Sequence, residues 1–446
     1  MDHTKDENMK QRQPNESADG PDNAAPSAGT SVEDGARAAK PGDRMAVKYR
    51  FDDADMDFFF VVALGWGAEG GLSVGQAFHV AAGITDGDAD SWVDAFTRYG
   101  DRLDAQAQAW KERGWTRQSA EMRFNAFASY RSAWQFAERG DSFLSIYAKQ
   151  RLAFAVAMTG LGFPATFFDT PYGGKTLPGV FLRNAKPDAP VVLLIGGADT
   201  GFEDTFMSAG RGLFERGYSV AMVDLPGQGT TMVDGLFWES ESERPIAAVV
   251  DVLIDRFGAR AGRLALMGCS LGGYFATRAA GHEPRFGAVI ASTPFPRPGE
   301  LFAAQAAAVA ASGSAKSSAS RRNHEVLFWK AGASNGQQFL ARTALMHADP
   351  AIVTVPFLSI VGSGESPLMI AQARAWAAAI PSARKDLVFL DASTGADGHV
   401  QVNNRRRLAQ EASGWLDEVF AARNDSRDSG DAAAPSLTIP ARTTRQ

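Results

Sequence analysis

The sequence predicts an α/β protein in which a mostly parallel, doubly wound sheet follows an all-helical N-terminal region. Three observations lead to this fold class. After about residue 162, short apolar runs typical of buried strands alternate with stretches of helical periodicity. Before residue 162, apolar residues recur at three- and four-residue steps, and strand-like alternation is absent. Within the second region, an apolar run turns sharply at residues 268–272 and continues as an Ala-rich helix.

The composition is that of a large globular protein with balanced charge. The chain has 446 residues, of which 45% are hydrophobic, and this length favours two domains or one large domain with a cap. Its 45 basic and 51 acidic residues are interspersed, so we expect neither nucleic acid nor a membrane among its partners. The N-terminus is too polar for a signal peptide, and the resulting expectation is a cytoplasmic location.

Composition and periodicity also suggest domain boundaries. The expected segments are a disordered tail at 1–45, a helical cap domain at 46–161, an α/β domain at 162–423 with a helical insertion at about 293–350, and a second disordered tail at 424–446. Both tails lack the aliphatic residues whose burial would offset the entropy of ordering them.

Each element follows from the local pattern. In the helical segment, aromatic residues at helical spacing predict four or five helices, including 91–111, 116–137 and 142–158. In the α/β segment, the expected strands are 164–169, 177–183, 191–195, 218–223, the run from 264 to the sharp turn, 286–291, 355–361 and 386–390. The expected helices there include 203–216, 244–257, 368–379 and 404–420.

The sharp turn carries the most specific motif. It reads G-C-S-L-G around Ser270, which is the G-x-S-x-G pattern in its required setting between a strand and a helix. Side chains at Gly268 and Gly272 would collide with the neighbouring strand and helix, whereas Ser270 projects above the sheet. The Leu271 N–H begins the helix and can face a developing oxyanion. The single cysteine, Cys269, faces into the fold and acts as a small apolar residue.

A serine nucleophile needs a base and an acid that orients this base. Of the six histidines, His399 lies in the Gly-flanked loop T-G-A-D-G-H-V, which returns to the sheet edge above Ser270. Glu365 is the preferred acid because G-S-G-E directly follows a strand between the serine and the histidine. Asp391, at the end of the next strand, and Asp397 are its rivals. The predicted order along the chain is serine, acid, histidine.

A second oxyanion donor should come from the loop after the third strand. This loop reads G-G-A-D, and its position favours the N–H of Ala198. Asp199 and Asp204 are interpreted as caps that complement the dipole of the following helix, and Asp224 as a carboxylate that structures its loop. The G-x-G-x-x-G spacing of dinucleotide sites is absent, and no cluster with metal-ligand spacing occurs.

Taken together, these motifs resemble the α/β-hydrolase superfamily. They are G-C-S-L-G-G at the turn, G-G-A-D-T-G-F-E-D, D-L-P-G-Q-G, G-S-G-E and D-G-H, within residues 49–421. The branch that the chain resembles includes 2,6-dihydroxypseudooxynicotine hydrolase and esterase-like relatives, in which a helical domain caps the catalytic one. The resemblance implies hydrolysis of an ester or C–C bond without a cofactor. Many members carry Asp where Glu365 stands.

The predicted function is hydrolysis of a small carbonyl compound at an ester or at a C–C bond next to a ketone. An acyl transferase or cyclase that uses the same acyl-enzyme, and a non-catalytic receptor on the same fold, are the alternatives. Because the cap segment is rich in aromatic residues and has no charged cluster, we expect an apolar or aromatic substrate. The aromatic candidates are Trp66, Phe124, Tyr130 and Trp134. Whether the chain forms a homodimer is left open.

Overall fold

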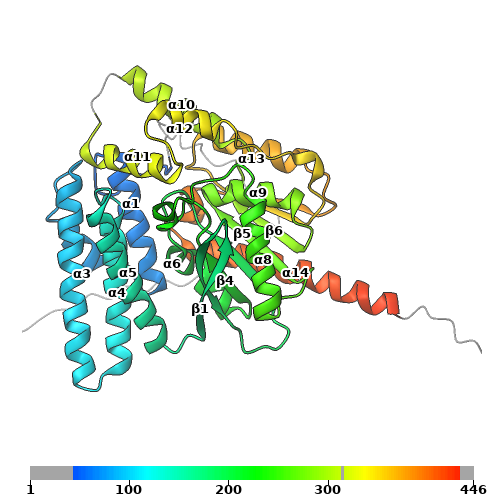
Figure 1. Ribbon diagram of the computed structural model, residues 1–446, viewed down its shortest axis with the longest axis horizontal. Coiled ribbons are helices and arrows are strands. Elements are labelled where there is room, and N and C mark those ends of the chain that lie inside the picture. The colour runs from blue at the N-terminus through cyan, green and yellow to red at the C-terminus, as the bar shows by residue number, and fades with distance from the viewer. Residues whose placement is uncertain (1–43, 313–315, 432–446) are drawn as a thin grey trace, which may run out of the picture. The chain divides into compact units, whose positions relative to one another are not determined.

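The computed structural model of the chain describes residues 44–312 and 316–431 (Figure 1). Of the two predicted tails, residues 1–43 and 432–446 lie outside the described residues. Arg44 and Met45, which the sequence assigns to the first tail, are partly buried and hydrogen-bonded to or packed against later segments. The last helix continues to Asp431, beyond the predicted start of the second tail.

The helical region comprises five α-helices, in agreement with the sequence pattern. They are α1 (Ala54–Gly65), α2 (Val74–Ala81), α3 (Ala89–Glu112), α4 (Thr116–Trp134) and α5 (Asp141–Gly160), with a 3-10 helix η1 (Trp66–Glu69) after α1. Asp53 caps α1, because its side chain accepts a hydrogen bond from the Met56 N–H. The buried carboxylate of Asp57 accepts backbone N–H bonds from Tyr49, Arg50 and Phe51, which ties the preceding segment to α1.

A single eight-stranded sheet follows. Its strands are β1 (Ala165–Tyr172), β2 (Lys175–Leu182), β3 (Val191–Ile195), β4 (Ser219–Val223), β5 (Leu264–Cys269), β6 (Phe286–Ser292), β7 (Phe357–Gly362) and β8 (Lys385–Leu390). Their spatial order is β1-β2-β4-β3-β5-β6-β7-β8. Strand β2 pairs antiparallel with β1 and β4, and the other pairs are parallel. The sheet is therefore mostly parallel, as predicted, and the carboxyl ends of β3, β5, β6 and β7 meet at one edge.

Helices connect the strands. They are α6 (Phe202–Thr205), a π-helical turn η2 (Phe206–Gly210), α7 (Arg211–Glu215), η3 (Thr231–Asp234), α8 (Glu243–Phe257), α9 (Leu271–His282), α10 (Pro298–Ser312), α11 (Ser318–Lys330), α12 (Gly336–Thr343), η4 (Pro350–Ile352), α13 (Pro367–Ala379), η5 (Ala392–Thr394), η6 (His399–Gln401) and α14 (Arg405–Asp431). The helix predicted at 203–216 is thus three short helical pieces. None of the helices in the described part of the chain is long and apolar enough to cross a membrane.

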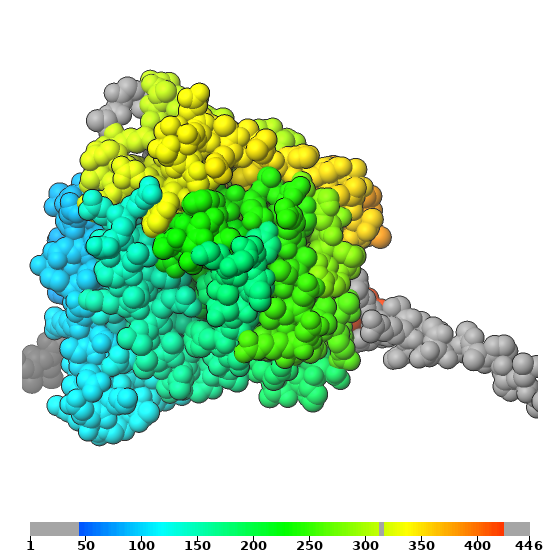
Figure 2. Space-filling view, in the orientation of Figure 1, coloured from blue at the N-terminus to red at the C-terminus, as the bar shows by residue number. Residues whose placement is uncertain are grey.

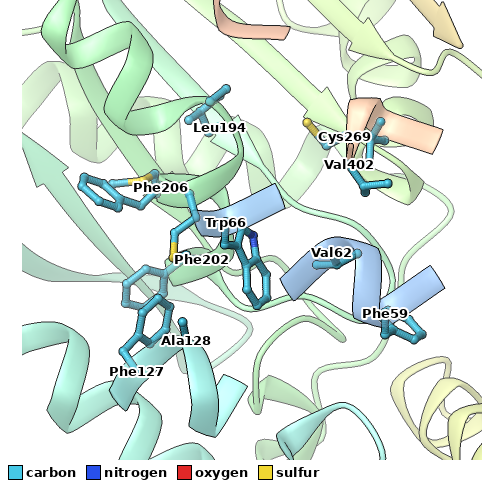
Figure 3. Packing of buried hydrophobic residues seen from close by; sticks show 14 of the residues in the cluster. Phe59, Val62, Trp66, Phe127, Ala128, Leu194, Phe202, Phe206, Cys269 and Val402 are labelled. Atoms are coloured by element: carbon cyan, nitrogen blue, oxygen red, sulfur yellow. The ribbon is translucent and has the colours of Figure 1, made fainter. Parts of the chain in front are cut away.

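One hydrophobic core joins the helical region to the sheet. Figure 3 shows Phe127 of α4, Trp66 of η1 and Phe206 of η2 converging in this core, with Leu194 of β3 close by. All four side chains are at most 2% exposed. Burial of large aromatic side chains at this boundary removes much apolar area from water, so the helical region is integral to the fold.

The insertion between β6 and β7 consists of α10, α11 and α12. Helix α11 packs on the helical region: the Ser318 hydroxyl accepts from the Ala89 N–H at 2.8 Å, and the Arg322 guanidinium lies 2.6 Å from Asp90. In Figure 2, the yellow surface of this insertion lies directly against the blue and cyan surface of the helical region. The two segments therefore contact each other although they are far apart in sequence.

Candidate active site

Ser270 stands on a strained turn between β5 and α9. Its backbone angles are φ 57° and ψ −122°, a region that non-glycine residues adopt at a cost of about 1–3 kcal/mol. The flanking glycines are required by close packing. A Cβ on Gly268 would lie 1.9 Å from the Gly272 carbonyl oxygen, and one on Gly272 would lie 2.5 Å from the Ile195 carbonyl oxygen. Both glycines are thus needed for the reason that the sequence pattern suggested.

His399 lies beside this serine. Its Nε2 is 2.9 Å from the Ser270 Oγ, within hydrogen-bonding distance. The loop that carries His399 can approach because Gly362 ends β7: a Cβ there would lie 2.1 Å from the Asp397 carbonyl oxygen. After the histidine, Gln401 has a positive φ of 50°, and its side chain accepts a hydrogen bond from Ser292 at 2.8 Å.

Glu365 is the carboxylate nearest to the other side of the imidazole. Its Oε2 lies 3.3 Å from His399 Nδ1, and its Oε1 accepts a hydrogen bond from the Thr293 hydroxyl. The rival acids are engaged elsewhere. Asp391 is exposed and caps η5 by accepting from the Ser393 N–H, and Asp397 accepts from the Asn403 amide at 2.9 Å. The structure therefore brings Ser270, His399 and Glu365 together.

The loop after β3 passes against the serine. A Cβ on Gly197 would lie 2.8 Å from the Ser270 Cβ. The Gln228 amide donates to the carbonyl oxygens of Gly196 and Gly197 at 2.6 and 3.0 Å. In a planar trans peptide, the carbonyl and the following N–H point in opposite directions. The Ala198 N–H is consequently directed away from Gln228, and Leu271 supplies the first N–H of α9.

Helix α1 and the segment before it cover the histidine, which the sequence analysis did not anticipate. The Phe58 ring lies 6.1 Å from the imidazole ring, and the Arg44 guanidinium lies 3.8 Å above the Phe58 ring. The His399 backbone N–H donates to the Arg44 carbonyl at 2.7 Å. These contacts enclose the site, and His399 is only 7% exposed. A surface hollow of about 470 Å³, lined in part by Tyr172, contains none of these residues.

A second group of polar residues is buried beyond the loop after β3, and we call it the buried charged cluster. Its members come from α4, α5, α6, the loop after β4, and α11, and all are buried except the partly exposed Arg151: Arg131, Tyr147, Arg151, Glu203, Asp204, Asp224 and Lys330. Arg131 pairs with Asp204 at 2.6 Å and donates to the Asp199 carbonyl at 3.0 Å. The expected absence of a charged cluster in the helical region was wrong, because these residues are isolated from one another along the chain.

Two further pairs belong to the buried charged cluster. Arg151 lies 3.2 Å from Glu203, and the Tyr147 hydroxyl lies 3.3 Å from an oxygen of Asp224. Asp204 does lie in the first turn of α6, as predicted for a cap, but its carboxylate is buried against Arg131 rather than exposed. Asp224 likewise takes part in a buried contact in addition to any role in its loop.

Burial controls protonation in the buried charged cluster. Loss of hydration raises the pKa of Glu203 to about 7, although Arg151 opposes this shift. Burial also raises the pKa of Asp224 well above its usual range, and nearby Glu203 adds to the effect. For Lys330, burial lowers the pKa to about 8. Such shifts favour the neutral form of each side chain, and they cluster at functional sites in proteins.

Of the four aromatic candidates, only Trp134 contacts the side chain of Lys330. The Lys330 Nζ lies 4.9 Å from the centre of its ring, and the Arg131 guanidinium lies 5.0 Å from it. Phe124 packs on other phenylalanines in the core, and Tyr130 donates a hydrogen bond to Asp101. Trp66 is buried in the core that joins the helical region to the sheet.

Comparisons with known proteins agree with this fold. A sequence model of the prolyl oligopeptidase family matches residues 206–423, a range that contains Ser270, Glu365 and His399. Hydrolase LUC6 of a Fusarium species is 30% identical over 262 residues, which cover 54% of this chain and 60% of LUC6. 20-Hydroxy-prefusarin hydrolase FUS2 of Gibberella moniliformis is 31% identical over 252 residues, covering 52% of this chain and 60% of FUS2. The chain thus aligns with about 60% of the length of these relatives.

Solved structures extend the similarity to the helical region. The crystal structure of 2,6-dihydroxy-pseudo-oxynicotine hydrolase matches with a TM-score of 0.65 at 19% identity, covering 80% of this chain and 96% of that one. AbyA5 matches with a TM-score of 0.55 at 17% identity, covering 78% and 95%. At these identities, the likeness concerns the fold alone.

Fold, turn motif and relatives together show that the chain has an α/β-hydrolase fold and is similar in sequence to hydrolases of that fold. Its fold is similar to that of 2,6-dihydroxy-pseudo-oxynicotine hydrolase over most of both chains, in agreement with the resemblance that the sequence motifs indicated.

Proposed function

We propose that the chain is a serine hydrolase that cleaves an ester, or a C–C bond next to a ketone, in a small and largely apolar carbonyl compound. The observation that carries this proposal is the 2.9 Å contact between Ser270 Oγ and His399 Nε2 on a G-x-S-x-G turn. His399 would take the serine proton as Ser270 attacks the carbonyl carbon. Glu365, 3.3 Å from Nδ1, would orient the ring and stabilise the imidazolium.

The negative charge of the tetrahedral intermediate needs donors. The N–H groups of Leu271 and Ala198 are the candidates, since both belong to segments that pass beside Ser270. His399 would then return its proton to the leaving group, an alkoxide from an ester or a carbanion from a C–C bond. Water, activated by the same histidine, would release the acid. This sequence requires no cofactor.

The cover over His399 favours small substrates over polypeptides. Phe58 and Arg44 lie on the imidazole side of the site, and His399 is nearly buried. An extended peptide needs an open cleft on both sides of the scissile bond, whereas a small carbonyl compound can be enclosed. The covered histidine thus favours a small carbonyl compound even though the matching family is named for an oligopeptidase.

The test is a panel of small esters, amides, β-diketones and proline-containing peptides, assayed with wild type and Ser270→Ala. We expect turnover of esters or β-diketones by wild type, with loss in the variant, and covalent labelling of wild type alone by a fluorophosphonate. Turnover of peptides without any of small carbonyl compounds would contradict the substrate class. Equal labelling of both proteins would contradict the role of Ser270.

A further inference from the structure

Lys330, at the end of α11, is buried without a hydrogen-bond partner. Its side chain is 0% exposed, and its Nζ contacts no acceptor among the described residues. It lies over the ring of Trp134, with the Nζ 4.9 Å from the ring centre. A lysine ammonium has three donors, and burial without acceptors is unfavourable, so a fold that keeps this residue has another use for it.

Other groups in and beside the buried charged cluster are also incompletely paired. Gln150, which is fully buried on α5 three residues after Tyr147, has no partner for either of its amide atoms among the described residues. The carboxylate of Glu203 makes no hydrogen bond there, although Arg151 lies 3.2 Å from it. The Nε1 of Trp134 is unpartnered as well. Buried polar groups of native proteins are nearly always hydrogen-bonded, so several orphans in one place indicate a site for polar atoms from outside the chain.

The buried charged cluster adjoins the catalytic serine through the loop after β3. At one end of this loop, Gly197 lies against Ser270; at the other end, a Cβ on Gly201 would lie 3.3 Å from the Tyr147 hydroxyl. Four Cα steps separate the two glycines, which limits their distance to about 15 Å. Ser270 and the Tyr147 end of the buried charged cluster are therefore close enough together for one small molecule to span.

The charged side chains of the buried charged cluster indicate which functional group of a ligand would bind there. Arg131 and Arg151 already have carboxylate partners in Asp204 and Glu203, whereas Lys330 has none within hydrogen-bonding distance. Asp199 and Asp224 also influence Lys330, but burial favours the neutral form of Asp224. The cation that lacks a partner thus requires an acceptor that carries negative charge, and a small ligand can bring it.

We propose that Lys330 is the specificity residue of the substrate pocket and binds an anionic oxygen, a carboxylate or ionised enol, remote from the scissile carbonyl. This inference rests on the proposed serine hydrolase function and refines its substrate class. The apolar or aromatic body of the substrate would contact Trp134, while its anionic end would supply the acceptor that Lys330 lacks. The substrate would then be amphipathic rather than wholly apolar.

A matched pair of esters tests the inference. 4-Nitrophenyl hydrogen glutarate carries a carboxylate at the far end, and 4-nitrophenyl pentanoate is its neutral counterpart with the same leaving group. Wild type should hydrolyse the anionic ester with the higher kcat/KM. Lys330→Met should lower kcat/KM for the anionic ester by about 10- to 100-fold, the range of a hydrogen bond to a charged group, and change the neutral ester less than about threefold. Lys175→Met, an exposed lysine on β2, should change neither.

The Tm of Lys330→Met distinguishes a role of Lys330 in ligand binding from a purely structural role. If Lys330 serves a ligand, Lys330→Met should keep or raise Tm, because a buried unpaired cation is replaced by an apolar side chain of similar length. A lower Tm together with an equal loss for both esters would overturn the inference and assign Lys330 a purely structural role. Equal kcat/KM ratios in wild type and Lys330→Met would overturn it too.

Binding to the inactive protein makes the outcome independent of turnover. Ser270→Ala should bind intact 4-nitrophenyl hydrogen glutarate more tightly than the pentanoate, and Ser270→Ala/Lys330→Met should lose this preference. If the preference appears and disappears in this way but wild type hydrolyses neither ester, the proposed function fails while the assignment of Lys330 stands. Absence of any preference in Ser270→Ala would overturn the assignment even where hydrolysis depends on Ser270.

Discussion

The catalytic edge, by which we mean Ser270, His399 and Glu365, and the buried charged cluster lie against the two ends of the loop after β3, but their side chains are held in different ways. At the catalytic edge, each side chain is positioned by contacts to backbone or neighbouring side chains: Ser270 by glycine close approach, His399 through Arg44, Glu365 through Thr293. In the buried charged cluster, the Lys330 ammonium and the Glu203 carboxylate are buried without hydrogen-bond partners among the described residues. At the catalytic edge, His399 Nδ1 and Glu365 Oε2 also make no hydrogen bond within the described part of the chain, but they lie 3.3 Å from each other, whereas Lys330 has no such partner there.

This difference separates the residues that would carry out the reaction on any carbonyl substrate from the residues that would select the substrate of this chain. The proposed triad would serve any carbonyl substrate, because it would act on the carbonyl group alone. Unpaired buried groups are unfavourable for stability and therefore indicate a ligand of definite chemistry. The variants below break one region while leaving the other intact.

The largest expected effect lies at the catalytic edge. Ser270→Ala and His399→Ala should each lower kcat by roughly 10⁴- to 10⁶-fold, because the triad members act as a unit. The double variant should be no worse than either single one. Steady-state kinetics on the best ester would show this, with circular dichroism as the control for folding. More than about a tenth of wild-type activity in Ser270→Ala would exclude this serine as the nucleophile.

A smaller loss should follow from changing the acid. Glu365→Gln should lower kcat by on the order of 10²- to 10⁴-fold, because the hydroxyl and the base remain while the imidazolium loses its counter-charge. Asp391→Asn is the matched control, since Asp391 is exposed and caps η5, and it should change kcat less than twofold. The reverse ranking of the two variants would make Asp391 the acid.

Among substitutions in the buried charged cluster, we expect those in the Arg131–Asp204 ion pair to change the free energy of unfolding most. Removing one partner of a buried pair leaves a lone charge, so Arg131→Met should lower the free energy of unfolding by about 3–5 kcal/mol. Arg131→Met/Asp204→Leu should recover much of this loss, because no charge is left unpaired. Urea unfolding would measure both. Arg117→Met, from an exposed pair with Glu121, should cost less than about 1 kcal/mol.

The smallest effect concerns pH and Glu203, which faces Arg151, Arg131, Asp204, Tyr147 and Asp224. Its pKa is raised from 4.5 to about 7. The folded state thus binds this proton more tightly than the unfolded state, so the contribution is fully present below about pH 4.5 and is lost as the pH rises through 7. Relative to Glu203→Gln, wild type should lose on the order of 1–3 kcal/mol between pH 4.5 and 7. Parallel profiles for the two proteins would contradict the raised pKa.

The catalytic edge could be predicted from the sequence because its signals are local. Ser270 stands in a five-residue motif, and Glu365 and His399 each follow a strand within a Gly-containing turn. The parallel sheet then brings strand ends together without further information. The cover by Phe58 and the hydrogen bond from Thr293 to Glu365 were missed. The only sign of the hydrogen bond from Thr293 in the sequence was that this threonine directly follows β6, the strand beside β5 and the Ser270 turn.

The buried charged cluster could not be predicted because tertiary packing alone assembles it. Arg131 and Lys330 lie on helices that look ordinary in sequence, since a single charge on a helix is usually solvated. Which face of α4 or α11 is buried depends on how the insertion packs on the helical region. The boundaries of short helices were also missed, because the π-helical turn η2 divides a segment of continuous helical periodicity.

The hydrogen bond from the His399 backbone N–H to the Arg44 carbonyl has a practical consequence for protein engineering. Trimming the chain up to residue 43 should spare the catalytic loop, whereas trimming through Met45 removes the acceptor of this N–H and the ion pair of Arg44 with Asp55. A rigid fusion partner joined at residue 44 would strain the loop that carries His399, the proposed general base. Arg44 thus fixes the N-terminal segment to the loop that carries His399. Moving the first residue of a shortened protein from 44 to 46 would therefore decide whether the purified protein keeps the proposed activity.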